Sequence, residues 1–274
     1  MTTGPAAVHP PVRVTLAQLR VGADHGAARD AAWHAFDAAA AAGADLLVLP
    51  EYASGFDPRG VGREHAEPLD GPFVALLAER AAESGVAVIA GTTLPGDGRL
   101  AVNAVVAFDG DGDLVGVYRK VHLYDAFGHR ESDRLEPGPA DAEPLVLQVG
   151  DLRFGVLTCY DLRFPESARR VVDAGADVLV VPAAWAAGPL KAMHWRALAV
   201  ARAIESTAAV VAVGQAGPGV TGHSVVVGAD GVVVLELDEH PALASADLLP
   251  AAIAQVRETN PSLANRRYAV VPRG

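Results

Sequence analysis

Short apolar runs rich in Val, Ile and Leu alternate along the chain with longer alanine-rich stretches. Short β-branched runs are typical of buried strands, and long alanine-rich stretches are typical of helices. We expect strands at 12–19, 44–49, 86–93, 102–108, 114–119, 145–149, 152–158, 177–181, 208–214, 223–228 and 232–237. We expect helices at 24–42, 71–84, after Pro165, and 191–207. This alternation of strands and helices predicts the α/β fold class.

The two halves of the chain resemble each other. Gly-Ala-Asp-Leu-Leu-Val-Leu-Pro at 43–50 corresponds to Gly-Ala-Asp-Val-Leu-Val-Val-Pro at 175–182, and a hairpin with an Asp-Gly turn at 102–119 corresponds to another at 222–237. Alanine-rich α/β units can look alike by chance, but the shared order of elements favours an internal pseudo-two-fold repeat. Two such halves predict two sheets face to face with helices outside, in one domain.

The domain organisation expected from these patterns has three parts. We expect a flexible N-terminal tail at 1–11, a single domain at 12–258 and an extended C-terminal segment at 259–274. The N-terminus lacks a positive start followed by an apolar run, and no apolar run reaches the ~18 residues of a membrane helix. These patterns predict a cytoplasmic protein that does not associate with membranes.

Composition narrows the possible partners. The chain of 274 residues is 51% apolar and carries a net charge of −11, so it would repel nucleic acids and anionic membrane surfaces.

The single cysteine of the chain excludes an intramolecular disulfide and a cysteine-based metal cluster. Aspartates 109, 111 and 113 resemble the start of a calcium loop, but Leu114 and Lys120 occupy positions where glycine and glutamate are required. We therefore predict no metal and no cofactor.

Three groups that can carry chemistry directly follow predicted strands: Glu51, Lys120 and Cys159. Strand ends are where α/β folds gather functional residues, because the sheet fixes the backbone and the loops leave a crevice. Only two of the 22 basic residues are lysines, Lys120 and Lys191, so arginine serves for ordinary surface charge. A retained lysine then favours a site that requires a compact ammonium group.

The three residue types form a consistent hydrolytic set. A thiol must become a thiolate to attack a carbonyl, and a nearby carboxylate can accept its proton and later return it to a leaving amine. An ammonium group can stabilise the thiolate and the oxyanion that forms on attack. Histidines 122, 129, 194 and 223 leave a Cys–His enzyme as an alternative, although histidines after strands are commonly structural.

Four motifs in the chain resemble the nitrilase, or carbon–nitrogen hydrolase, superfamily. They are Leu-Pro-Glu-Tyr at 49–52, Tyr-Arg-Lys-Val-His-Leu at 118–123, Cys-Tyr-Asp-Leu-Arg-Phe-Pro-Glu at 159–166 and Gly-His-Ser at 222–224. The resemblance implies a four-layer α-β-β-α sandwich that commonly forms a homodimer or higher homo-oligomer, with the C-terminal segment at the interface. It makes Glu51 the general base, Lys120 the oxyanion stabiliser and Cys159 the nucleophile, with the backbone N–H of Tyr160 as a second oxyanion donor.

The same resemblance implies a second glutamate near this set, in a Glu-Ser pair six residues before Pro-Gly. Glu131 fits that spacing relative to Pro137, and Glu136 is the competing choice. A solvated loop carboxylate is the alternative for either residue.

Further residues are candidates for the walls of the substrate pocket. Trp185 follows the strand at 177–181 in the position that mirrors Tyr52, although it could also be a core aromatic residue. Arg163 and Lys191 are candidates to bind a substrate carboxylate. Pairing of Arg163 with Asp161 or Glu166, and a surface location for Lys191, are the alternatives.

The residues after Cys159 are similar to the amidase branches, most closely to the ω-amidase and deaminated-glutathione amidase group, since true nitrilases usually have tryptophan and glutamate there. The resemblance implies hydrolysis of a small linear ω-amide of a carboxylic acid, with release of ammonia through a cysteine thioester. Alternatives are an N-carbamoyl amino acid hydrolase, a nitrilase, or a catalytically inactive dimeric scaffold. The loop after Glu51 and the segment 188–193 depart from the group's pattern, so the sequence leaves the exact substrate open.

Overall fold

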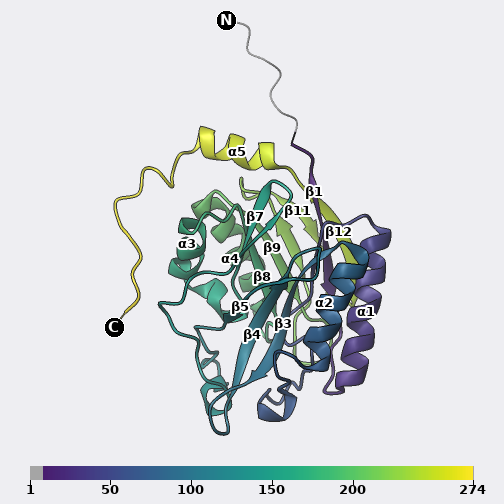
Figure 1. Cartoon of the computed structure of the whole chain (residues 1–274). Helices are drawn as coiled ribbons and strands as arrows, with labels where there is room; N and C mark the ends of the chain where they lie inside the picture. Colours follow the sequence, from purple (N-terminus) through teal and green to yellow (C-terminus); the bar gives the residue numbers. More distant parts are fainter. Residues whose placement is uncertain (1–8, 274) are drawn as a thin grey trace, which may run out of the picture.

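Two six-stranded sheets lie face to face in the computed structural model of the chain, which describes residues 9–273 (Figure 1). The first sheet has the order β12 (Ala242–Leu248), β1 (Val12–Gln18), β2 (Leu46–Val48), β3 (Ala87–Pro95), β4 (Ala101–Phe108) and β5 (Leu114–Arg119). The second has the order β11 (Val233–Glu236), β10 (Val225–Val227), β9 (Ala209–Gly214), β8 (Val178–Ala183), β7 (Leu152–Val156) and β6 (Val146–Val149).

The two sheets have the same internal plan. Strands β1, β2 and β3 are parallel in one sheet, as are β7, β8 and β9 in the other. On one side of each parallel group lie two antiparallel strands, β4 and β5 in the first sheet and β10 and β11 in the second. On the other side lies a single antiparallel strand, β12 in the first sheet and β6 in the second. The two sheets therefore repeat one α/β unit, as the similarity of the two halves predicts.

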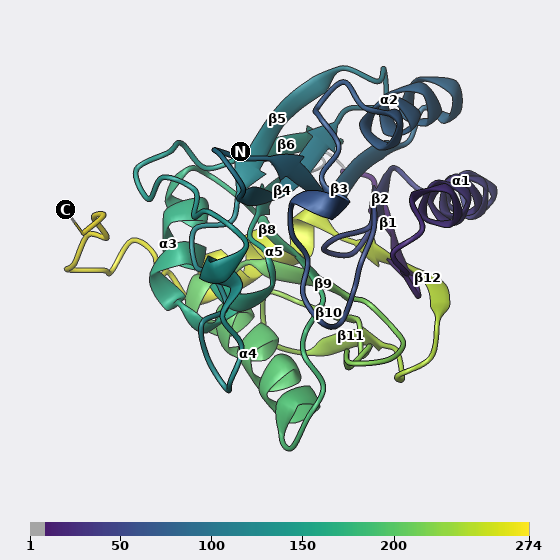
Figure 2. The same cartoon turned by 90° about the horizontal axis from the view of Figure 1, so that it is seen from below.

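Helices cover the outer faces of both sheets (Figure 2). Helices α1 (His25–Ala41) and α2 (Pro72–Ser84) pack on the first sheet, and α3 (Pro165–Asp173) and α4 (Lys191–Ser206) pack on the second. The residues favour these elements locally: Asp24 caps α1 through the N–H of Ala27, and α2 begins at a proline. The predicted four-layer α-β-β-α sandwich is confirmed.

Three apolar layers hold the sandwich together. The middle layer lies between the sheets and includes Leu16, Ile89, Phe154 and Val211, none of which is exposed. The outer layers lie between each sheet and its helices, with Phe36 in one of them and Trp195 in the other. Each such large side chain contributes about 1.5–3 kcal/mol when it is fully buried. The sheets are therefore rigid supports for the loops at their ends.

Two elements were not predicted from the sequence. Strand β12 pairs antiparallel with β1 along its whole length and completes the first sheet. Helix α5 (Pro250–Thr259) follows it and buries Ile253. Part of the predicted N-terminal tail, residues 1–8, lies outside the described residues. None of the helices in residues 9–273 combines the length and apolar character needed to span a bilayer.

Candidate active site

Glu51 lies just past the end of β2 and is 1% exposed. Its backbone is tightly enclosed: a Cβ on Gly91 of β3 would come within 2.4 Å of the Cα of Glu51, so a glycine is required there. Oε1 of Glu51 accepts hydrogen bonds from Lys120 Nζ at 3.0 Å and Asn103 Nδ2 at 2.7 Å, and Oε2 accepts one from the N–H of Ala184 at 2.6 Å. The carboxylate is thus fixed by donors from both sheets.

Lys120 follows β5, and its side chain is completely buried between two carboxylates. Besides its bond to Glu51, its Nζ donates to the carboxylate of Glu131 at 2.9 and 3.1 Å. Burial alone would lower the pKa of Lys120, but the charges of Glu131 and Glu51 outweigh it and raise the pKa well above its usual value. These charges therefore favour the charged ammonium form of Lys120.

The structure separates the two competing loop glutamates. Glu131 lies in a short 3-10 helix, Glu131–Asp133, and also accepts hydrogen bonds from the hydroxyl of Tyr52 at 2.9 Å and the N–H of Tyr124 at 2.7 Å. Glu136 instead forms an ion pair with Arg119 outside this cluster. Of the two, Glu131 is the carboxylate that contacts the buried lysine.

Cys159 begins a 3-10 helix, Cys159–Arg163, directly after the segment that leaves β7. Its φ of 45° places it in the left-handed region, a conformation that costs about 1–3 kcal/mol and persists only where the surroundings impose it. Burial, and then the negative charge of Glu51, raise the pKa of the Cys159 thiol well above its usual value, while Lys120 opposes this shift. The resting thiol is therefore protonated at neutral pH.

A buried aspartate holds the turn that carries the cysteine. Asp161 is 0% exposed and accepts hydrogen bonds from the Tyr118 hydroxyl at 2.7 Å, the N–H of His122 at 3.2 Å and the N–H of Thr158 at 3.1 Å. The ring of His122 also lies 2.8 Å from it. These contacts connect the cysteine turn to the segment that carries Lys120, so the two groups keep a constant relative position.

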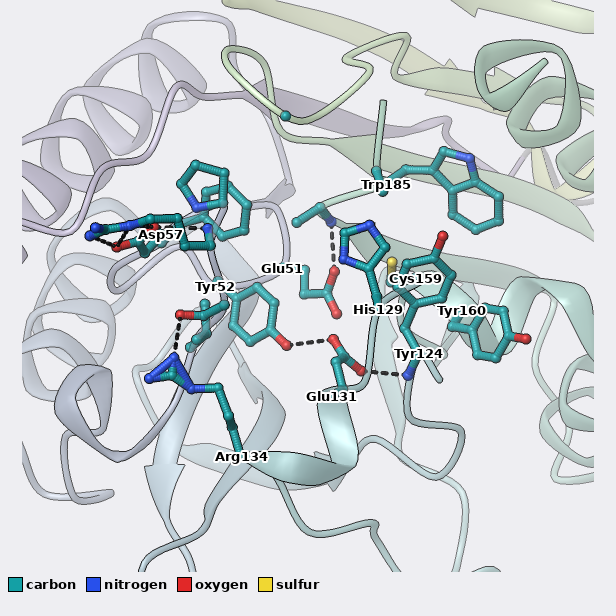
Figure 3. A pocket seen from close by; sticks show the side chains of 18 of the residues that line it. Glu51, Tyr52, Asp57, Tyr124, His129, Glu131, Arg134, Cys159, Tyr160 and Trp185 are labelled. Carbon is teal, nitrogen blue, oxygen red and sulfur yellow. Dashed lines mark hydrogen bonds and ion pairs between the residues drawn. The ribbon is translucent and has the colours of Figure 1, made fainter. Parts of the chain in front are cut away.

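A cleft of about 150 Å³ opens above these groups and is lined by Glu51, Glu131 and Cys159 (Figure 3). The residues predicted to bind the substrate also line it, and they are Tyr52, Arg163, Trp185 and Lys191. Tyr160, whose backbone N–H is the predicted second oxyanion donor, lines it as well. The structure thus brings together every candidate except Lys120, which lies behind Glu51 and Glu131 and contacts both. Tyr52 uses its hydroxyl to hold Glu131, and burial, then the charge of Glu131, raise the pKa of Tyr52 well above its usual value.

Two cations face the cleft without a carboxylate partner. Within residues 9–273, neither Arg163 nor Lys191 forms an ion pair, so the alternative pairing of Arg163 with a neighbouring acid is wrong. The Nε and Nη2 atoms of Arg163 are buried and lack any hydrogen-bond partner. Lys191 is only 7% exposed, so it is not a surface lysine. Burial and the charge of Arg163 lower the pKa of Lys191.

Comparisons with known proteins agree with this arrangement. The family model for carbon-nitrogen hydrolase matches residues 13–258. The chain belongs to the carbon–nitrogen hydrolase family. It is 39% identical over 226 residues to a deaminated glutathione amidase from Escherichia coli. These residues cover 82% of this chain and 85% of that protein.

Solved structures show the same fold for this carbon–nitrogen hydrolase. A superfamily protein from Xanthomonas campestris, solved with an arsenic adduct in its active site, superposes with a TM-score of 0.84 at 28% identity and covers 96% of this chain and 99% of its own. An amidase from Nesterenkonia sp. gives a TM-score of 0.78 at 27% identity, with coverage of 94% and 99%. The activity of the family to which the chain belongs is hydrolysis of a carbon–nitrogen bond.

Sequence reasoning missed three contacts around the general-base candidate of this hydrolase. Asn103 is an isolated polar residue in the otherwise apolar, fully buried β4, and that isolation was the available signal. Gln215 follows β9 and donates from Nε2 to the carbonyl of Glu51 at 2.6 Å. The N–H of Ala184 belongs to the backbone, so no residue type could have revealed it.

The residues that could ligate a metal lie apart from this cleft. Within the described part of the chain, only Asp238, Glu239 and His240 bring three potential ligand atoms together, and all three are exposed. None of them lines the cleft. The groups that do line it, a thiol with carboxylates and a buried ammonium behind them, can by themselves provide a nucleophile, a proton acceptor and an oxyanion partner.

Proposed function

We propose that Cys159, Glu51 and Lys120 form the catalytic triad of an amidase, with Glu131 supporting Lys120. The observation that carries this proposal is the fully buried ammonium of Lys120, which is held between two carboxylates beside the only thiol of the chain. Burying an ion costs several kcal/mol unless it is well paired. An ammonium paired twice under a cleft is suited to stabilise a further negative charge that forms during reaction.

The hydrogen bonds of Glu51 indicate where it accepts a proton. A carboxylate offers about four lone-pair positions, two on each oxygen. Lys120 and Asn103 occupy Oε1, and the Ala184 N–H occupies one position on Oε2. The remaining position on Oε2 is therefore the one available to the proton of Cys159.

The reaction then has two halves. Glu51 takes the thiol proton, the sulfur of Cys159 attacks the amide carbon, and Lys120 with the N–H of Tyr160 stabilises the oxyanion. When the carbon–nitrogen bond breaks, Glu51 returns the proton to the leaving nitrogen, which departs as ammonia and leaves a thioester. Glu51 next deprotonates a water molecule that attacks the thioester, and the proton returns to the sulfur as the acid is released. This sequence consumes one water for each amide and leaves the enzyme unchanged.

We further propose that the substrate is a small linear ω-amide that carries a carboxylate. Arg163 presents two buried, unpartnered nitrogen atoms, Nε and Nη2, and Lys191 presents a second cation at the same cleft. A substrate carboxylate would satisfy both, and a bidentate contact with arginine would fix the amide relative to Cys159. The deaminated glutathione amidase from Escherichia coli is an amidase relative that supports this choice.

The substrate proposal is tested by kcat/KM for an ω-amide acid against the same amide with its carboxylate esterified. We expect a strong preference for the acid that is lost in Arg163→Met, which keeps much of the side-chain volume but removes the charge. Arg196→Met is the matched control, because Arg196 is exposed and pairs with Glu236. Preference for the ester, or activity only on nitriles or carbamoyl compounds, would contradict the substrate while leaving the triad untouched. In a thiol-alkylation assay, a Cys159 that reacts no faster than an ordinary buried thiol would instead favour the catalytically inactive scaffold.

We also propose that two copies of the chain form a homodimer through the face where the C-terminal segment runs past α3 (Figure 1). A largely apolar groove of about 470 Å³ lies there, lined by residues of β5, α3 and 269–273. Tyr268 and Val271 nearby are 91% and 75% exposed, so the single chain leaves large apolar groups in water. Light scattering should show a dimer, and removal of 260–274 should weaken it. A full-length monomer at micromolar concentration would contradict this assembly.

A further inference from the structure

Phe127 occupies an unusual position beside the cleft. It lies in the loop between β5 and the short helix that carries Glu131, and it is 65% exposed. Its φ of 55° is in the left-handed region, which a bulky side chain adopts only where other contacts hold it there. It is not among the residues that line the cleft. Its ring instead contacts charged groups that belong to the cleft lining.

Those groups are the two unpaired cations. The Nζ of Lys191 lies 3.5 Å from the centre of the Phe127 ring, and the Cζ of Arg163 lies 5.5 Å from it. Both distances are within the range of a cation–π contact. Arg163 also contacts the ring of Trp185, and Lys191 contacts Tyr124. Among the described residues, Phe127 is the aromatic ring that the two cations share.

Two like charges at one site repel each other, and here no carboxylate of the described chain compensates them. The lowered pKa of Lys191 reflects this cost, since burial and the charge of Arg163 both contribute to it. Lys191 has one further partner on this side, the hydroxyl of Tyr124 at 2.6 Å. The Phe127 ring adds one shared electron-rich face to those that Trp185 and Tyr124 each offer to one of the cations.

We propose that Phe127 is a specificity-determining positioning residue, whose ring holds the ammonium of Lys191 beside the guanidinium of Arg163 so that the pair forms one receptor for a carboxylate. This inference rests on the proposed carboxylate-bearing substrate. Because Phe127 acts through the cations and lies outside the cleft lining, its loss should weaken recognition of the carboxylate more than the chemical step.

The test compares Phe127→Leu, which keeps an apolar side chain but removes the ring, with Phe127→Trp, which keeps an aromatic face. The readout is the ratio of kcat/KM for an ω-amide acid to that for its methyl ester. Phe127→Leu should lower this ratio by about two- to tenfold, mainly through the KM of the acid, and Phe127→Trp should restore it. Met193→Ala is the matched control, because Met193 is 52% exposed on the helix of Lys191 but has no ring.

The outcomes distinguish a failure of this inference from a failure of the proposed carboxylate-bearing substrate. If Arg163→Met removes the preference for the acid and Phe127→Leu leaves it unchanged, Phe127 has no positioning role and only this inference fails. If Arg163→Met leaves the preference unchanged, the carboxylate receptor itself is refuted. An equal loss of activity on acid and ester in Phe127→Leu, or the same loss in Phe127→Trp, would also overturn the inference. Thermal unfolding of each variant shows whether the fold is retained.

Discussion

Exchanging Lys120 for arginine keeps the positive charge but changes its size, shape and hydrogen-bond directions. The side chain of Lys120 is 0% exposed, and its Nζ makes three contacts of 2.9–3.1 Å with Glu51 and Glu131. A guanidinium group cannot occupy the same point between the two carboxylates without displacing one of them. Overpacking of this kind typically costs about 1–3 kcal/mol of stability.

The catalytic effect of Lys120→Arg should exceed the effect on stability. Removing one donor to a developing oxyanion typically lowers kcat by about 10²–10³, which corresponds to about 2.7–4 kcal/mol. We therefore expect kcat for an ω-amide acid to fall by at least about 100-fold while the variant still folds. Ammonia release measures kcat, and thermal unfolding measured on the same sample separates lost activity from lost structure.

The neighbouring residue provides the control for this exchange. Arg119 precedes Lys120, is 42% exposed at its side chain and pairs with Glu136. The reverse exchange Arg119→Lys should change stability by less than about 0.5 kcal/mol and leave kcat near the wild-type value. If Lys120→Arg keeps a kcat close to that of Arg119→Lys, Lys120 is not an oxyanion partner and the reasoning is refuted.

Two further predictions concern Glu51 and its neighbour Asn103. Asn103→Leu removes the donor 2.7 Å from Glu51 Oε1, so kcat should fall by about tenfold or more with little change in KM, and an unchanged kcat would contradict a positioning role for Asn103. Glu51→Gln removes a negative charge that raises the pKa of Cys159, while Lys120 continues to lower it. The midpoint of thiolate formation should therefore move to lower pH, which ultraviolet absorbance can follow because the chain has one thiol. A midpoint that stays or rises would show that the two groups are not coupled.

The sequence carried enough information for the sheets but not for their last strand. Strands such as 102–108 and 208–214 are strong apolar runs, and the structure has β4 and β9 within a residue of those bounds. Strand β12 reads Ala-Leu-Ala-Ser-Ala-Asp-Leu, in which alanine alternates with leucine, serine and aspartate before a final leucine, and the β-propensity is weak. It becomes a strand because it pairs with β1, a contact between opposite ends of the chain that no local pattern reveals.

The candidate site could likewise be predicted from the sequence only in part. Glu51, Lys120 and Cys159 each follow a strand and could be found from that position together with the family's motifs. The difference between Glu131 and Glu136 depends on how one loop folds back over Lys120, and sequence spacing alone left both open. The contact of Phe127 with two cations depends on a left-handed backbone conformation, which residue types do not predict for phenylalanine.

Intact-protein mass spectrometry of an acid-quenched reaction tests the central claim most directly, because Cys159 is the only residue that can form a thioester. Wild-type enzyme turning over an ω-amide should gain the mass of the acyl group without the amide nitrogen. Cys159→Ala should gain no mass, keep the fold and retain less than about a few per cent of the wild-type kcat. An adduct that still contains the nitrogen, an adduct on Cys159→Ala, or substantial turnover by that variant would contradict covalent catalysis by Cys159.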